Sequence, residues 1–543
     1  MNIMTTNKIF AFILPAMLLL LSSCGDFLEE SSQDTDYVRS WSDLNELLIG
    51  SCYMPVNTTS HYSSQPTSNA SWGTGNYGML LHLVGDEVQE VTAKGQHDEF
   101  ESHYREFGAY TWQQFIGQNE TYTDTYTENY EWQKAYNAIN VANNVLSSLD
   151  DVPQRSDEEQ QGALKVAGEA HFLRGWYYFW LVNLYGKPYD PATASSAPGV
   201  PIKTSAEVQD IVYTRQSVQQ VYDQVLSDLH AAEAELSQYR TVKKSIYRAD
   251  STAVCLLLSR VYLYMQNWPK AAEYARKVIA HHPALQNMNT TTAAFMQASN
   301  VENIFSMGGD DVTAMLMPGA GGLQVSNSLY NSYANDDRRK SQWFWTYGTF
   351  LGLTKQPTGS HYEAVPPTND LYYYYMFYAG RLGYQSEVSS LFWLRSAEAY
   401  LNLAEAEAYQ GNDAAARTAL LTLMQNRYNN NAAELDLSAT SGSALITLIR
   451  EERRREFALE GHRWFDLRRY RVCTVQPSKT SITHDFTYYA NHTSVTPVET
   501  RRYVLTKDDA SWTLPIPHEV LEYNTGMEGN GNQWRTFTTI RNY

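Results

Sequence analysis

Apolar and small residues recur with helical spacing along two long segments, and each segment is broken once by a turn. In segment 253–280, Leu257 and Val261 share one helical face, and small or apolar residues recur after a break at Asn267. Segment 397–427 has the same form, with its break at 411–413. Residues three or four positions apart lie on the same face of an α-helix. Each segment therefore predicts two helices joined by a tight turn, as in a tetratricopeptide repeat.

Three further segments, 132–144, 163–184 and 217–236, carry the same helical pattern. The second stops at Gly186, and Pro188 follows just beyond it, which is typical of a helix end. Small residues on the facing sides let neighbouring helix pairs stack closely. We therefore predict a mostly α-helical fold with about four tetratricopeptide-like helix pairs, interrupted by long loops rich in aromatic residues.

The segment from Leu445 to Phe457 combines an apolar stripe with a dense run of Arg and Glu. Glu451 and Glu452 both lie within one helical turn of Arg455, so either can pair with it. Gly461 is a natural end for such a helix. Ion pairs of this kind are common on helices and individually weak. We interpret these charges as a structural ion network rather than as a ligand site.

The N-terminal residues predict a lipid anchor. Lys8 precedes an apolar run that extends to Leu21, which is too short to cross a bilayer and is typical of a signal peptide. The run ends in Ser22-Ser23-Cys24, and small residues before a cysteine suit a lipoprotein signal peptidase. We predict that residues 1–23 are a lipoprotein signal peptide and that Cys24 is lipidated and becomes the new N-terminus.

Charge and hydropathy narrow the choice of partners. The 543 residues include 41 basic and 59 acidic side chains, which gives a formal net charge of −18. Nucleic-acid binding needs a concentrated basic surface, so a nucleic-acid partner is disfavoured. After the signal peptide there is no second apolar run long enough to span a bilayer. We expect contact with the membrane through the lipid anchor only.

The long loops carry much of the chain's 40 Tyr and 13 Trp. A flat aromatic ring can cover the C–H face of a sugar while polar neighbours bind its hydroxyl groups. For any single residue, packing in the core is the competing interpretation. We place Trp112 first, because it lies in a polar, aromatic-rich stretch outside any periodic helix. The candidate glycan-binding residues are Tyr104, Tyr110, Trp112, Trp343, Trp345 and Tyr347.

Motifs for catalysis are lacking. The sequence has no G-x-S-x-G elbow and no H-E-x-x-H metal motif. Acidic pairs at 310–311 and 336–337 precede residues typical of turns, so we assign them solvated or capping roles. Two carboxylates can still meet in space from distant loops, which keeps a surface glycosidase as an alternative. We expect no cofactor, although a structural calcium ion bound by acidic loops stays an alternative.

Several stretches resemble the SusD/RagB family. The clearest is IREERRREFALEGHRWFDLRRY at 449–470, together with EWQKAYNAINVANN, AHFLRGWYYFWLVNLYG, WLRSAEAYLNLAEAEAYQG and LPIPHEVLEYN. The Asn-Pro-Gly that usually follows the last stretch is replaced by EGNGN at 528–532. The resemblance implies an N-terminal region with tetratricopeptide-like helices over 24–300 and a RagB/SusD C-terminal region over 301–543.

The same resemblance implies a function. SusD-like proteins are outer-membrane lipoproteins that bind glycans on loop aromatics and pass them to a SusC-like TonB-dependent transporter, without catalysis. Acidic residues after Cys24, such as Asp26 and Glu29, resemble surface-export signals, so we expect a lipid-anchored protein on the outer face of the outer membrane. Some RagB-like members are thought to capture peptides or another nutrient, and that alternative stays open.

Overall fold

The computed structural model describes residues 38–54, 80–91, 107–118, 130–207, 211–240, 245–291, 295–307, 316, 322–347, 349–355, 388–490 and 496–543. Three sequence predictions lie outside these residues: the lipidated Cys24, the aromatic candidate Tyr104 and the acidic pair at 310–311. Of Tyr347, only the backbone belongs to the described part.

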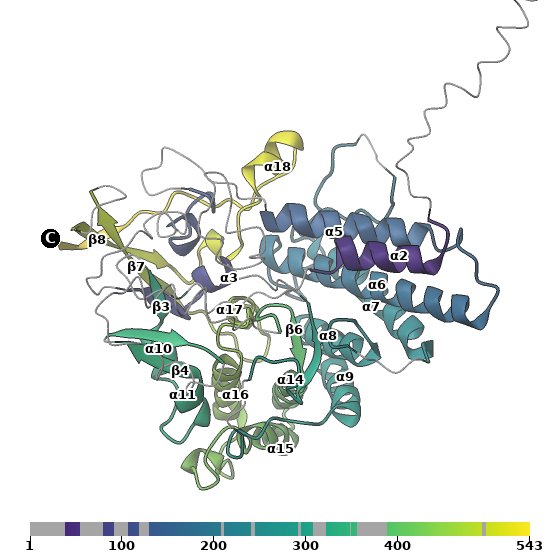
Figure 1. Ribbon diagram of the computed structural model, residues 1–543. Coiled ribbons are helices and arrows are strands. Elements are labelled where there is room, and N and C mark those ends of the chain that lie inside the picture. Colours follow the sequence, from purple (N-terminus) through teal and green to yellow (C-terminus); the bar gives the residue numbers. More distant parts are fainter. Residues whose placement is uncertain are drawn as a thin grey trace, which may run out of the picture.

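The three single helices predicted from the sequence are present (Figure 1). They are α5 (Tyr130–Ser147), α6 (Asp157–Tyr185) and α7 (Val218–Gln238). A capping box begins α6: the Ser156 hydroxyl accepts a hydrogen bond from the Glu159 backbone N–H, and the Glu159 carboxylate accepts one from the Ser156 N–H. The α6 helix ends before Gly186, as the sequence predicts.

Both predicted helix hairpins are also confirmed. The first consists of α8 (Ser251–Tyr264) and α9 (Trp268–His281), and the Asn267 side chain caps α9 by accepting from the Lys270 N–H. The second consists of α14 (Ser396–Tyr409) and α15 (Asp413–Met424). Its turn contains Gly411 with φ of +78°, a backbone conformation that glycine adopts without steric cost.

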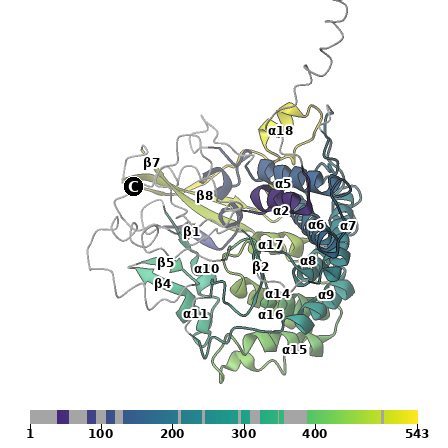
Figure 2. The same ribbon diagram turned by 45° about the vertical axis from the view of Figure 1, so that its right-hand side comes forward.

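The helices stack in order on one side of the molecule, as Figures 1 and 2 show. In this stack α5 packs on α6, α6 on α7, α8 on α9, α9 on α14, and α14 on both α15 and α16 (Gly442–Glu456). At Gly175 of α6, an added Cβ would lie 3.2 Å from the Asp228 Cβ on α7, so the two helices approach closely. The predicted mostly helical fold with paired helices is therefore confirmed.

Short strands and helices make up the other side (Figure 2). The antiparallel strand pairs are β1 (Val88–Glu90) with β3 (Leu323–Val325), β2 (Asn303–Ser306) with β6 (Trp393–Arg395), and β4 (Phe344–Tyr347) with β5 (Phe350–Leu353). A three-stranded sheet has the order β7 (Ile482–Tyr489), β8 (Pro497–Leu505), β9 (Thr538–Asn542). Two further helices, α2 (Trp41–Leu47) and η1 (Leu48–Cys52), pack against α5 and α6 in the helical stack. The remaining helices are α3 (Leu80–Leu83), α10 (Asn327–Tyr330), α11 (Arg338–Trp343), η5 (Ala433–Leu435), α17 (Arg463–Arg471), η6 (Ala510–Trp512) and α18 (His518–Tyr523).

The charges of α16 form a buried network, which agrees with the structural interpretation. Glu456 accepts from three guanidinium groups, those of Arg339 at 2.8 Å, Arg395 at 2.6 Å and Arg427 at 2.8 Å. These side chains are almost fully excluded from solvent. Because the three arginines come from different segments, the network ties α11, β6 and the turn after α15 to α16.

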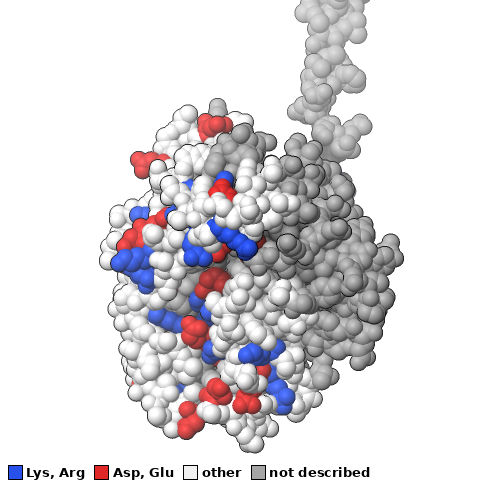
Figure 3. All heavy atoms as spheres, turned by 90° about the vertical axis from the view of Figure 1, so that its left-hand side faces the viewer, with Lys and Arg blue, Asp and Glu red and all other residues white. Residues whose placement is uncertain are grey.

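Within the same helix, Arg455 pairs with Glu452 at 2.8 Å, which is one of the two pairings that the sequence allowed. On the face of the molecule seen in Figure 3, acidic and basic side chains of the described residues are intermingled.

Candidate functional site

Trp112, the first choice for a sugar platform, lies in the protein core. Its indole N–H donates to the Val84 carbonyl at 3.0 Å, and its ring stacks on His484 with centroids 4.4 Å apart. Only 3% of Trp112 is exposed, and Tyr110, which also stacks on His484, is equally buried. Neither ring can offer a face to a ligand from this position, so the structure corrects both assignments.

Trp343 is also interior. It ends α11, contacts Phe295 with ring centroids 5.1 Å apart, and holds the Lys355 ammonium 4.3 Å from its ring centre. With 1% exposure it packs in the core rather than forming a binding surface. Its assignment as a glycan-binding residue is corrected for the same reason as that of Trp112.

Among the candidates whose side chains the structure describes, Trp345 is the one that is not buried. It is half-buried on β4, opposite Gly352 of β5. A Cβ added to Gly352 would lie 2.2 Å from the Trp345 ring, so the ring lies directly over this glycine. Phe350 contacts the ring at a centroid distance of 5.0 Å. The assignments of Trp345 and of Tyr347, which lies on the same strand, as glycan-binding residues stay predictions.

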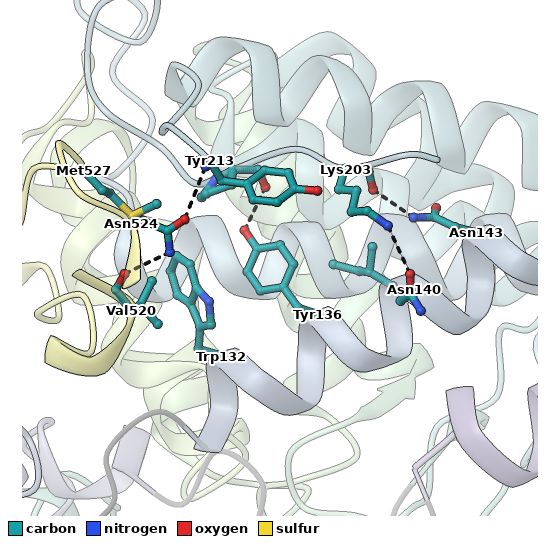
Figure 4. Close-up of a pocket in the computed structure, with 11 residues that line it drawn as sticks. Trp132, Tyr136, Asn140, Asn143, Lys203, Tyr213, Val520, Asn524 and Met527 are labelled. Atoms are coloured by element: carbon teal, nitrogen blue, oxygen red, sulfur yellow. Dashed lines mark hydrogen bonds between the residues drawn. The ribbon is translucent and has the colours of Figure 1, made fainter. Parts of the chain in front are cut away.

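A cavity elsewhere brings together aromatic and polar side chains, the combination that was predicted for the loops. It has a volume of about 240 Å³ and lies between α5, the connection from α6 to α7, and the C-terminal residues from α18 onward (Figure 4). Its lining residues are Trp132, Tyr136, Ile139, Asn140, Asn143, Pro201, Lys203, Tyr213, Val520, Asn524 and Met527. None of these was among the predicted binding residues.

The α5 side of the cavity follows from helical spacing. Trp132, Tyr136 and Asn140 lie four residues apart, so they form one stripe along the helix. Trp132 packs edge-on against Tyr185 and also contacts Tyr136, with ring centroids 5.1 and 5.0 Å apart. These contacts hold the two rings that begin the stripe, while Asn140 is exposed.

The opposite wall is held in place by hydrogen bonds to backbone carbonyls. Tyr136 donates its hydroxyl proton to the Pro201 carbonyl at 2.7 Å, and Asn143 donates to the Lys203 carbonyl at 3.0 Å. Burial raises the pKa of Tyr136 well above its ordinary value, so the phenol stays a donor. Arg215 donates to the Gly199 and Glu528 carbonyls at 2.7 and 2.9 Å, which joins the α6–α7 connection to the C-terminal segment.

Polar groups gather at one end of the cavity. The Lys203 ammonium donates to the Asn140 amide oxygen at 3.2 Å and to the Ser205 carbonyl at 2.9 Å, which leaves one of its protons available. Among the described residues, the Tyr213 hydroxyl and the Asn140 amide nitrogen have no hydrogen-bond partner. In Figure 4 the Tyr213 hydroxyl lies on the side of Lys203, away from Trp132.

The third wall comes from the C-terminal region. Val520 and Asn524 lie one helical turn apart, and the Asn524 side chain accepts a hydrogen bond from the Tyr213 backbone N–H at 3.2 Å. Met527 closes the apolar end. The cavity therefore combines aromatic and aliphatic walls with a few polar groups at one end, a lining typical of small-molecule sites.

The sequence shows one of the three walls of this site. The Trp132, Tyr136, Asn140 stripe is visible as an i, i+4, i+8 pattern, but such a stripe on an amphipathic helix is normally read as core. The other two walls come from residues about 70 and 390 positions later in the chain. Only the tertiary structure brings them together.

The acidic pair at 336–337 has structural roles. Asp337 caps α11 by accepting from the Arg339 N–H at 2.9 Å, and it also pairs with the Arg339 guanidinium. Asp336 accepts from the Asn429 amide at 2.7 Å. Among the described residues, no group of three or more His, Cys, Asp and Glu side chains could hold a metal ion. No helix in the described part of the chain is long and apolar enough to cross a membrane.

Two family models match the chain and between them cover most of it. One, described as "Starch-binding associating with outer membrane", matches residues 76–263, and the other, described as the SusD family, matches residues 285–534. The chain therefore belongs to the SusD/RagB family, as the sequence motifs predicted.

Curated relatives agree with this assignment. SusD-like protein P2 of Formosa agariphila is 26% identical over 383 residues, which are 63% of this chain and 71% of that protein. SusD-like protein P38 of the same organism is 28% identical over 171 residues, and this match spans only 29% of its length and 31% of this chain.

Solved structures show the same fold. A SusD superfamily protein from Bacteroides thetaiotaomicron has a TM-score of 0.64 and 22% identity, with 91% of this chain and 100% of that chain covered. Surface glycan-binding protein A from Bacteroides fluxus has a TM-score of 0.57 and 18% identity, with the same coverage.

Proposed function

We propose that this protein is a lipoprotein on the outer face of the outer membrane that binds an oligosaccharide and delivers it to a SusC-like TonB-dependent transporter. The observation that carries the proposal is the cavity between α5, the α6–α7 connection and α18. Its Trp132, Tyr136 and Tyr213 side chains supply aromatic surface, and Asn140 and Lys203 supply hydrogen-bond donors beside it.

This combination suits a sugar ring. Moving the C–H groups of a pyranose from water onto an aromatic or aliphatic wall costs little free energy. Its hydroxyl groups, in contrast, need hydrogen-bond partners when they leave water. The Asn140 amide, the Lys203 ammonium and the Tyr213 hydroxyl are the groups that can provide them. A volume of about 240 Å³ suits a single ring rather than a long chain. We assign the cavity to one sugar residue of a longer ligand.

Family membership supports the rest of the proposal. One matched family is described as starch-binding and associated with the outer membrane, and a structural relative is titled a surface glycan-binding protein. These descriptions speak of binding and not of catalysis, in agreement with the prediction that the chain is not an enzyme. The lipid anchor at Cys24, exposure at the cell surface and the transporter partner rest on the sequence motifs and the family resemblance.

The test is calorimetric titration of the purified domain with maltoheptaose, followed by oligosaccharides of β-glucan, xylan and mannan and by short peptides. We expect one of the glycans to bind and to be recovered unchanged by chromatography. The Tyr213→Ala variant should bind it about tenfold more weakly, because it loses one ring wall and one hydroxyl group. Trp345→Ala, measured in parallel, tests the hairpin candidate in the same experiment.

Three outcomes would contradict the proposal. Binding of peptides but no glycan would favour the alternative nutrient, and release of shorter sugars would indicate a glycosidase. If a glycan binds equally well to Tyr213→Ala and to the wild type, while Trp345→Ala has lost affinity, the sugar site is the β4–β5 hairpin and not the cavity. A thermal melt of each variant separates lost binding from lost folding.

A further inference from the structure

An unusually exposed group of apolar side chains adjoins the cavity. Tyr523, the last residue of α18, is 85% exposed, and Ile211 and Val212 of the α6–α7 connection are 55% and 54% exposed. The three exposed residues are here called the Tyr523 surface. Along the chain, Tyr523 directly precedes Asn524, Val212 directly precedes Tyr213, and Ile211 lies two positions before Tyr213; Tyr213 and Asn524 are joined by a hydrogen bond. That pair lines the cavity, so the backbone of Val212 and of Tyr523, each the chain neighbour of a lining residue, lies at the edge of the cavity.

From this continuity we propose that the Tyr523 surface is a second carbohydrate subsite, on which the sugar residue next to the one in the cavity stacks. The inference rests on the proposed function and specifies it further. The ligand is then at least a disaccharide, with one ring enclosed by Trp132, Tyr136 and Tyr213 and the adjoining ring lying on the Tyr523 phenol outside the cavity.

The size of the Tyr523 surface favours a sugar over a protein partner. A stable protein interface takes about 800 Å² and some 20–30 residues from each partner, far more than three side chains offer. One exposed phenol ring with two aliphatic neighbours is instead similar in area to a single sugar ring. A few contacts of this size suit a weak, local interaction such as ring stacking.

The charges around Tyr523 point in the same direction. Glu522, next to it on α18, is exposed, and Glu528 a few residues later is exposed as well. Carboxylates accept hydrogen bonds from sugar hydroxyl groups, and such charge-assisted bonds are stronger than neutral ones. A hydrophobic protein contact would instead have to remove these charges from water without compensation.

The decisive experiment compares ligand lengths. Wild type, Tyr523→Ala, Tyr523→Phe and the control Tyr543→Ala are titrated with glucose, maltose, maltotriose and maltoheptaose, or with the matching series of whichever glycan the wild type binds. Tyr543 is a suitable control, because it is also an exposed tyrosine, with 53% exposure, and lies on the separate β8–β9 edge. Since Tyr523 makes little contact with the protein, its substitution should leave the thermal melt unchanged.

We expect Tyr523→Ala to weaken binding of the disaccharide and of longer ligands by about three- to tenfold and to leave monosaccharide binding unchanged. The variant would then lose most of the affinity that the second sugar ring adds. Tyr523→Phe should bind like the wild type, because the ring and not the hydroxyl group provides the stacking surface. Tyr543→Ala should have no effect at any length.

Equal affinities of Tyr523→Ala and the wild type for every length would overturn the subsite and leave the proposed function standing. A loss that is the same for glucose as for maltose would also overturn it, because Tyr523 would then act on the ring in the cavity. Failure of the wild type to bind any glycan would instead refute the proposed function, and the subsite would fall with it.

Discussion

At the scale of single residues, the structure separates aromatic side chains that fill the core from those that can meet a ligand. Trp112 and Tyr110 stack on His484 inside the protein, whereas Tyr213 and Tyr523 reach a cavity wall and the surface. Tyr110, Tyr213 and Tyr523 carry the same phenol ring, so residue type does not separate the two groups. Among these four rings, exposure distinguishes the structural rings from the candidate binding rings, whereas Trp132 lines the cavity with only 8% exposure.

The Trp112→Ala variant should therefore be less stable than the wild type, and the substitution should not weaken ligand binding directly. Removal of a buried tryptophan leaves a cavity and an unpaired Val84 carbonyl, and it typically costs about 3–5 kcal/mol of unfolding free energy. Urea denaturation followed by circular dichroism measures this loss. Trp345→Ala, at a half-buried position, should cost clearly less. A Trp112→Ala protein with wild-type stability and poor glycan binding would restore the original platform assignment.

At the scale of elements, the C-terminal helices are joined by buried charges. Glu456 of α16 faces Arg339, Arg395 and Arg427, and each arginine also pairs with a second carboxylate. Removing one partner of such a network leaves an uncompensated charge in the interior, which costs far more than the loss of an exposed pair. The network therefore fixes how the strand side of the molecule sits against the helical stack.

Arg427→Met should lower the unfolding free energy by about 3–5 kcal/mol, because Glu302 and Glu456 would lose a shared buried partner. Lys270→Met is the matched control: it breaks the exposed Lys270–Glu273 pair of α9, which water and salt screen, so it should change stability far less than Arg427→Met. Both variants are compared by chemical denaturation at neutral pH. Similar, small effects in the two variants would show that the buried network contributes little.

At the scale of the whole molecule, the proposed lipid anchor determines where the binding site works. The described domain begins at residue 38, and Cys24 lies 14 residues before it. A chain of that length spans at most about 50 Å when fully extended. A lipid at Cys24 would therefore keep the domain close to the membrane, where a transporter could receive the bound sugar.

If Cys24 is lipidated as proposed, Cys24→Ala should move the protein from the membrane fraction to the soluble fraction, because the variant would lack the acyl chains that anchor the domain. Fractionation of cells followed by immunoblotting measures this shift, and Cys52→Ala serves as the control. Cys52 is buried in η1 and should affect stability rather than location. Retention of Cys24→Ala on membranes after a high-salt wash would disprove the lipoprotein prediction.

The sequence by itself determined the helical elements and the family. The helix predicted over 163–184, which the structure extends to Asp157–Tyr185, and both hairpins follow from apolar spacing and turn residues, which act over a few neighbouring positions. The charged 449–470 stretch and the other motifs identified the SusD/RagB family for the same reason, because they are local patterns. The ion network of α16 was predicted as structural, although its distant arginine partners were not.

Only the tertiary structure decided which aromatic residues can form a site. The indole of Trp112 is buried by Val84 and His484, and His484 lies more than 370 residues further along the chain. The cavity likewise joins α5 to Tyr213 and Asn524 through contacts that no local pattern records. Burial depends on which distant segments pack together, so a polar, aromatic-rich stretch is equally compatible with a core ring and a binding ring until the chain has folded.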